Sequence, residues 1–288
     1  MLTSVSLYSP IGTFFDPPDM FLAAPKLVNV NLLFHIFPVV LPWEQARRFR
    51  TQSLTVTECL KFLGRSLNLQ ECHFEHIYSQ FISKIIMPHA QLKHFHVWLN
   101  NPETFMSLFD GITLPSLSKL CIQYNGSKRL PLSFITSLVL RSACNLERFT
   151  IGIQFNYADL IPCLEAVPSL TFLHLEMLRG PDMGLTRHFV ALLNPLSNSS
   201  QLLLPNLKYF FEFKGLVLCD CRTIVDMLAH RWHSSDDGRI SQGFRVSKLQ
   251  LAEVLSTVPY HVTADVQEEL RNLLEEGMLV RIESLVRN

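Results

Sequence analysis

A short pattern of apolar residues recurs along the chain and restricts its fold more than any other feature. In each copy an apolar residue is followed by two variable positions, a second apolar residue, one variable position and a third apolar residue. Clear copies occupy residues 69–74, 92–97, 117–122, 146–151 and 170–175. Apolar residues at alternate positions indicate a strand with one buried face. Apolar residues at helical spacing follow each copy, so the pattern predicts strands that alternate with helices.

The spacing of these copies is typical of a leucine-rich repeat. The clear copies start 23 to 29 residues apart, inside the period of roughly 20 to 29 residues of that repeat. Weaker units start at Leu27, Ala46, Leu207 and Val246, and the longest intervals contain turn-rich insertions at 194–200 and 234–238. We therefore predict an α/β solenoid shaped as a horseshoe. Its roughly nine or ten parallel strands form the concave face and its helices the convex face.

The repeats predict one leucine-rich-repeat domain over residues 24–284. An irregular N-terminal segment that can hold a first strand (1–23) precedes it, and a short tail (285–288) follows it. Two positions predict helix ends. Thr55 and Glu58 fit a capping box at the start of a helix. Gly277 stands where the end of a helix would need a left-handed residue.

The composition predicts a largely buried, intracellular chain in the cytoplasm or nucleus. Hydrophobic residues make up 48% of the sequence and charged residues only 17%. No clean run of about 18 apolar residues exists, so we expect no membrane span. The N-terminus lacks the features of a secretory signal. The seven cysteines then suit a reducing compartment better than a disulfide framework.

The residues between the apolar positions of each strand predict a binding surface, because they should point to the concave face. The residues assigned to that face include eight Lys or Arg and two acidic residues, although the chain has 25 basic and 25 acidic residues in all. Such a basic face would suit an acidic or phosphorylated segment of a partner protein. The candidate partner-binding residues are Arg48, Arg50, His73, Lys93, His94, His96, Lys119, Arg148, Phe172, His174, Tyr209 and Phe211.

Two interpretations of this face remain open. Phe172, Tyr209 and Phe211 would be its aromatic anchors if it binds a partner. In the alternative, the long polar side chains are simply solvated and their stems cover the sheet.

The sequence carries no motif for catalysis or for a cofactor. It lacks Gly-x-Ser-x-Gly, the glycine-rich phosphate loops, Cys-x-x-Cys and His-Glu-x-x-His. Cys219-Asp-Cys221 is the nearest approach to a metal-binding spacing. We therefore expect no enzyme activity, no metal and no cofactor. Nucleic-acid binding ranks low, because the isoelectric point is about 7.2 and runs of Lys or Arg are no longer than pairs such as Arg47-Arg48.

Several blocks of sequence resemble the repeat region of fungal F-box proteins. The similarity extends over about residues 24–284, and its blocks include Leu-Pro-Trp-Glu-Gln at 41–45, Arg-Ser-Ala-Cys-Asn-Leu at 141–146, and the segments 163–170, 204–207 and 270–277. This resemblance implies the substrate-recognition subunit of a Skp-cullin-F-box ubiquitin ligase. In such a subunit an N-terminal F-box binds the ligase core and the repeats bind a target protein.

The F-box itself has no counterpart in this sequence. The block at 41–44 lies between two predicted strands whose units start only 19 residues apart, and 1–23 is too short for three helices. We therefore expect a Skp-type adaptor to bind only if an F-box is supplied elsewhere. The alternatives are a stand-alone leucine-rich-repeat scaffold or inhibitor without ligase attachment, and a truncated fragment without function.

Overall fold

The computed structural model describes residues 2–7, 24, 26–32, 42–78, 86–126, 128–155, 157–176, 184–197, 202–233 and 246–285. They form two compact units of parallel strands and helices. The first unit consists of Met1–Gly126 and Phe134–Asn145, and the second of Ser127–Ser133 and Leu146–Asn288. The prediction of an α/β fold with parallel strands is confirmed.

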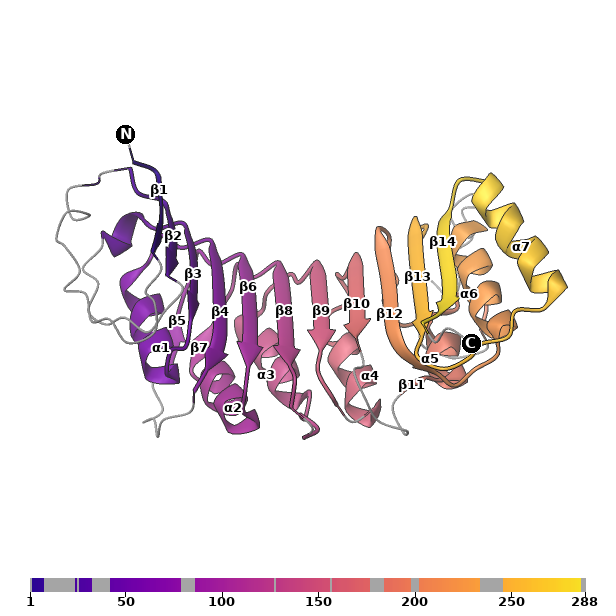
Figure 1. Ribbon diagram of the computed structural model, residues 1–288, viewed down its shortest axis with the longest axis horizontal. Coiled ribbons are helices and arrows are strands. Elements are labelled where there is room, and N and C mark those ends of the chain that lie inside the picture. The colour runs from indigo at the N-terminus through magenta and orange to yellow at the C-terminus, as the bar shows by residue number, and fades with distance from the viewer. Residues whose placement is uncertain are drawn as a thin grey trace. The chain divides into compact units, whose positions relative to one another are not determined.

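The first unit contains a sheet in which each strand pairs in parallel with the next (Figure 1). In spatial order the strands are β1 (Ser4–Leu7), β2 (Asn29–Leu32), β3 (Arg48–Gln52), β4 (Glu71–Ile77), β6 (His94–Leu99) and β8 (Lys119–Tyr124). A second pair joins β5 (Met87–Pro88) to β7 (Ile112–Thr113). The helices are the 3-10 turn η2 (Trp43–Gln45), α1 (Val56–Arg65), α2 (Pro102–Asp110) and most of α3 (Ser133–Ser142).

The second unit is built in the same way. Its strands follow the order β9 (Arg148–Gly152), β10 (Phe172–Glu176), β12 (Phe210–Val217), β13 (Leu251–Ser256) and β14 (Leu279–Ser284), all paired in parallel. The short strand β11 (Gly184–Leu185) also pairs with β12. Its helices are α4 (Tyr157–Glu165), α5 (Arg187–Leu193), α6 (Cys221–His233) and α7 (Ala264–Glu275).

Alternate strand residues pack against helices and form the core. In the first unit the ring of Phe49 stacks on Phe62 of α1 at a centroid distance of 3.8 Å. The ring of Phe95 lies 6.2 Å from Phe109 of α2. In the second unit Leu173 and its neighbours on β12 and β13 are likewise buried. The intervening residues point to the other side of the strands, which we call the open face of each unit.

The predicted helix ends are confirmed in their local geometry. Thr55 accepts a hydrogen bond from the backbone N–H of Glu58, and the Glu58 carboxylate accepts one from the backbone N–H of Thr55 at 2.7 Å. Gly277 has a φ of 96° directly after α7 and its cap residue Glu276. A side chain at that φ would be strained, whereas glycine adopts it freely.

Some predictions concern residues outside the described ranges. Strand β1 confirms a first strand in the segment 1–23, but residues 8–23 are not described. Also outside the described ranges are Leu41, the insertion at 234–238, residues 198–200 of the other insertion, and 286–288 of the tail. Within the described parts of the chain, no helix is long and apolar enough to span a membrane.

Candidate partner-binding surface

The open face of the first unit carries polar side chains in rows across its strands. Because the parallel strands are in register, residues from neighbouring strands stand side by side. The first row consists of Ser4, Asn29, Arg48, Glu71, His94 and Lys119. The second row consists of Ser6, Asn31, Arg50, His73, His96 and Cys121.

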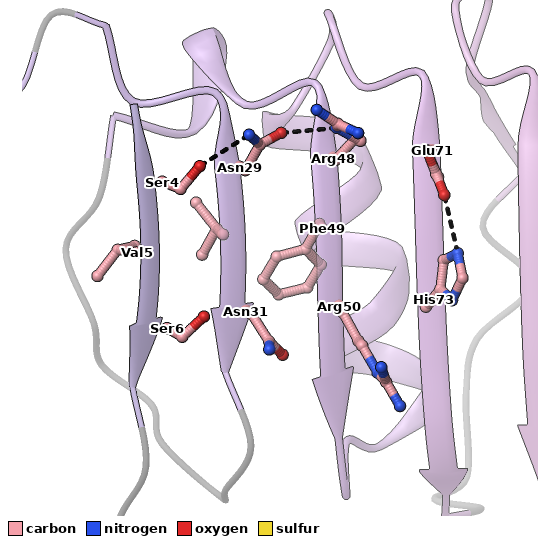
Figure 2. A pocket seen from close by; sticks show the side chains of 11 residues that line it. Ser4, Val5, Ser6, Asn29, Asn31, Arg48, Phe49, Arg50, Glu71 and His73 are labelled. Atoms are coloured by element: carbon pink, nitrogen blue, oxygen red, sulfur yellow. Dashed lines mark hydrogen bonds and ion pairs between the residues drawn. The ribbon is translucent and has the colours of Figure 1, made fainter. Parts of the chain in front are cut away.

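A hollow of about 390 Å³ lies over strands β1 to β4 (Figure 2). At its rim Asn29 Nδ2 donates to Ser4 Oγ at 2.9 Å, and Arg48 Nε donates to Asn29 Oδ1 at 2.7 Å. Among the described residues no acceptor contacts the two terminal nitrogens of Arg48. The chain of hydrogen bonds therefore orients the guanidinium group and leaves its outer N–H groups able to bind an anion.

A second hollow of about 410 Å³ lies at the starts of strands β2, β3, β4 and β6. Arg47, Arg48, Lys93 and His94 line it together with one carboxylate, that of Glu71. Burial lowers the pKa of His94, and the nearby charges of Lys119 and Lys93 lower it further, against the opposing effect of Glu71. The basic residues around this hollow thus outnumber the acidic ones.

His73, His94 and His96 lie close together on this face. His73 Nε2 is 3.1 Å from a carboxylate oxygen of Glu71, and the His73 and His96 rings are 4.9 Å apart. Burial lowers the pKa of His96, and the neighbouring His73 lowers it further. The Nε2 atom of His96 is buried and has no hydrogen-bond partner within the described ranges. Protonation of His96 is therefore opposed both by the loss of hydration and by the positive charge of His73.

Among the described residues, no group of three or more His, Cys, Asp or Glu side chains is placed to hold a metal ion. Cys219 and Cys221 are both buried. Burial raises the pKa of Cys219 to about 12 and that of Cys221 to about 11. Burial therefore favours the protonated form of both thiols at neutral pH.

The open face is mixed in charge, because it also carries carboxylates that the prediction did not assign to it. Glu75 lies on the open face of the first unit, where it accepts hydrogen bonds from Arg50 and Gln52, each at 2.9 Å. In the second unit Glu176 pairs with Lys214. The sequence pattern assigned only the first few positions of each strand to the open face. The strands continue past those positions, and the added residues include these carboxylates.

The predicted placement of Phe211 on the open face is wrong. Phe172 pairs in register with Phe210, and Leu173 pairs with Phe211. Phe211 is therefore fully buried on the helix side, and Tyr209 precedes the strand, with 49% of its surface exposed. Strand β12 starts three residues after the first apolar residue of its unit, Leu207, whereas the strands of the earlier repeats start two residues after that position. A shift of one residue sends every side chain of a strand to the opposite face.

The sequence interpretation missed Phe210, which takes the place on the open face predicted for its neighbours. Strand β12 shows strict alternation over eight residues, with Phe211, Phe213 and Val217 buried and Glu212 and Lys214 between them. This alternation is visible in the sequence and would have found the register. The repeat pattern, counted from Leu207, instead places the strand one residue too early.

The remaining candidate residues lie where the pattern predicts. Lys93 directly precedes β6. The other candidates of the first unit lie in its two rows, and they are Arg48, Arg50, His73, His94, His96 and Lys119. Arg148, Phe172 and His174 lie on the open face of the second unit. The structure thus brings the predicted cationic residues other than Arg148 together within the first unit. In the second unit it places Arg148 beside Phe172.

Comparison with protein-family models found no match, and comparison with curated proteins found none either. The chemistry of the two open faces is therefore the basis on which a function can be argued.

Proposed function

We propose that this chain is a protein-binding module of the leucine-rich-repeat type, whose open face holds an acidic or phosphorylated segment of a partner protein. The repeated strand and helix units, paired in register, support a solenoid with a concave strand face and a convex helix face. The observation that carries the proposal is the second hollow, where Arg47, Arg48 and Lys93 surround a single carboxylate.

The basic groups at this hollow differ in a way that suits a phosphate or carboxylate. Arg48 is oriented by its bond to Asn29 and can offer two parallel N–H groups to one anion. Lys93 acts as a flexible point charge. Lys119 pairs in register with His94 and adds a further cation at the same level of the sheet. A phosphoserine, with its charge of about −1.5 to −2 at neutral pH, would be attracted more strongly than a single carboxylate.

Fluorescence anisotropy with paired peptides tests this proposal. The full chain should bind a labelled phosphoserine peptide or an Asp-rich peptide more tightly than the same peptide with serine at those positions. The double variant Arg48→Glu and Lys93→Glu should lose this binding. The control is the double variant Lys61→Glu and Arg65→Glu, which makes the same charge change on exposed residues of α1.

The outcome against the proposal is equally specific. Charge reversal at Arg48, Lys93 and Lys119 that leaves peptide binding and partner capture unchanged would show that the hollow has no such role. Thermal melts of each variant separate loss of binding from loss of folding.

The resemblance to fungal F-box proteins supports a more specific proposal, in which the bound protein is presented to a Skp-cullin-F-box ubiquitin ligase. The alternative is a stand-alone scaffold or inhibitor. Co-purification of this chain with a Skp-type adaptor separates the two. Stable association would favour the ligase role, and the absence of association would favour the stand-alone role.

A further inference from the structure

The open face of the second unit carries a row of apolar side chains, one from each of four neighbouring strands. Register pairs Phe172 of β10 with Phe210 of β12, and Leu251 of β13 with Leu279 of β14. The pairing of Phe211 with Ala252 places Phe210 beside Leu251. We call Phe172, Phe210, Leu251 and Leu279 the apolar row.

The apolar row is accessible to a partner. Leu279 has 61% of its surface exposed, and the other three side chains are half-buried. The rings of Phe172 and Phe210 stack at 4.7 Å with an interplanar angle of 22°, and the guanidinium carbon of Arg148 lies 4.9 Å from the centre of the Phe172 ring. Contiguous apolar side chains left on a solvent-facing surface mark an interaction site.

Two carboxylates border the apolar row. The next residues along the same strands form a second line, His174, Glu212, Glu253 and Arg281. Glu212 contacts His174 Nδ1 at 3.0 Å, and Arg281 donates to Glu283 at 2.7 Å. Glu253 stands beside Arg281 in register and interacts with it electrostatically, and within the described residues no hydrogen bond or close ion pair occupies its carboxylate. This border therefore suits a cationic side chain of a partner.

We infer that the apolar row is a docking site for an amphipathic helix of a partner protein, with an apolar stripe on the row and Lys or Arg along one flank of the stripe. Neighbouring strands are about 4.8 Å apart, so the row spans about 14 Å. One turn of a helix rises about 5.4 Å, and three turns cover about 16 Å. Apolar residues at i, i+3 or i+4, and i+7 would thus meet successive strands.

This inference rests on the proposed function in one respect, namely that the open face binds proteins. It uses the second unit and a partner segment of opposite charge, whereas the acidic segment is assigned to the first unit. The two proposals can therefore fail separately.

Three synthetic helical peptides of equal length test the inference by fluorescence anisotropy with the full chain. The first has a leucine stripe flanked on one side by lysines, the second has glutamates in place of the lysines, and the third has serines in place of the leucines. Only the first should bind. The double variant Phe172→Ser and Phe210→Ser should weaken that binding about tenfold or more, and Glu212→Lys with Glu253→Lys should weaken it further at low salt.

Two variants guard against loss of folding. Leu279→Asp changes an exposed edge residue of β14 and should also weaken binding of the leucine and lysine peptide. Leu140→Ser changes a leucine of α3 that is 66% exposed and should have no effect. Binding of the Asp-rich peptide, measured on the same samples, should be unchanged in all the variants of the second unit.

Several results would overturn the inference. Equal binding of the lysine and glutamate peptides, or equal binding to the chain with and without Phe172→Ser and Phe210→Ser, excludes the apolar row as the docking site. Absence of binding by the first peptide also excludes it. Self-association of the chain in sedimentation experiments that the Phe172→Ser and Phe210→Ser variant abolishes would assign the row to a second copy instead.

Discussion

Arg231 of α6 is predicted to hold the loop before β12 in place, and its replacement by methionine should destabilise the second unit. Its side chain is fully buried. Nε donates to the carbonyl oxygen of Leu193 at 2.7 Å, and Nη2 donates to that of Leu203 at 2.9 Å. Nη1 and Nη2 also donate to Leu204, a residue with a φ of 54°. Burial lowers the pKa of Arg231 to about 9, so the group is still charged at neutral pH.

The magnitude follows from the acceptors left behind in Arg231→Met. The carbonyl of Leu204 keeps a second donor, the backbone N–H of Leu207 at 3.1 Å. The carbonyls of Leu193 and Leu203 lose the donors described above, and each unsatisfied buried acceptor costs about 1–3 kcal/mol. Removal of a buried cation offsets part of this cost. The expected net loss is about 2–4 kcal/mol of unfolding free energy.

Arg231→Lys provides the sharper comparison. Lysine keeps the charge but not the planar fork that reaches three carbonyls at once, so it should restore little of the lost stability. The control is Arg222→Met on the same helix, where the side chain is 49% exposed. Urea unfolding followed by circular dichroism gives the stability change. Hydrogen exchange of the β12 amides locates it.

The reasoning is refuted if Arg231→Met costs less than about 1 kcal/mol, or if Arg231→Lys is as stable as the unchanged chain. Faster exchange confined to strands of the first unit would also contradict it, because the contacts of Arg231 all lie in the second unit.

Four further predictions concern the first unit. Burial lowers the pKa of both His94 and His96, so the unfolded chain takes up protons first and stability should fall as the pH drops below about 6.5. Over the same range the protonated His94 should strengthen binding of an Asp-rich peptide in anisotropy titrations, and an affinity independent of pH would contradict this. Glu75→Gln should lower the free energy of unfolding measured in urea by about 1 kcal/mol. It should also tighten Asp-rich peptide binding, because Arg50 loses its counter-charge; weaker binding would argue against a role for that charge. Thr55→Ala should cost about 1 kcal/mol in thermal or urea unfolding through loss of the α1 cap, and an unchanged melt would show that the cap is dispensable.

The repeat pattern predicts the strands of the central region well because its apolar positions all reach the core. Leu69, Leu92 and Leu117 each lie two residues before the first residue of their strands and are fully buried. The following apolar residues, such as Phe95 and Val97, alternate with the polar residues of the open face. A strand with one buried face has a period of two, and this period is explicit in the sequence.

The charge of the face and the buried arginine are not predictable in the same way. Glu75 occurs in β4 beyond the end of the repeat pattern, next to an irregularity in register between Glu75 and Ile77. Whether such a carboxylate lies near a cation depends on the neighbouring strand, about 25 residues away in the sequence. Arg231 occupies a helix whose spacing alone assigns it no partner, because its acceptors are carbonyls of an irregular loop.

The register of β12 decides which partner the second unit can accept. Had Tyr209 and Phe211 faced outward with Lys208, as the repeat pattern implies, the face would combine aromatic anchors with a cation. The observed register instead presents Phe210 in line with Phe172, and Glu212 beside His174. A shift of one residue thereby replaces Phe211 on this face by Phe210 and adds the carboxylate of Glu212 next to it. The first unit has its excess of basic side chains at the second hollow. Partner segments that bind the two units should therefore differ in the sign of their charge.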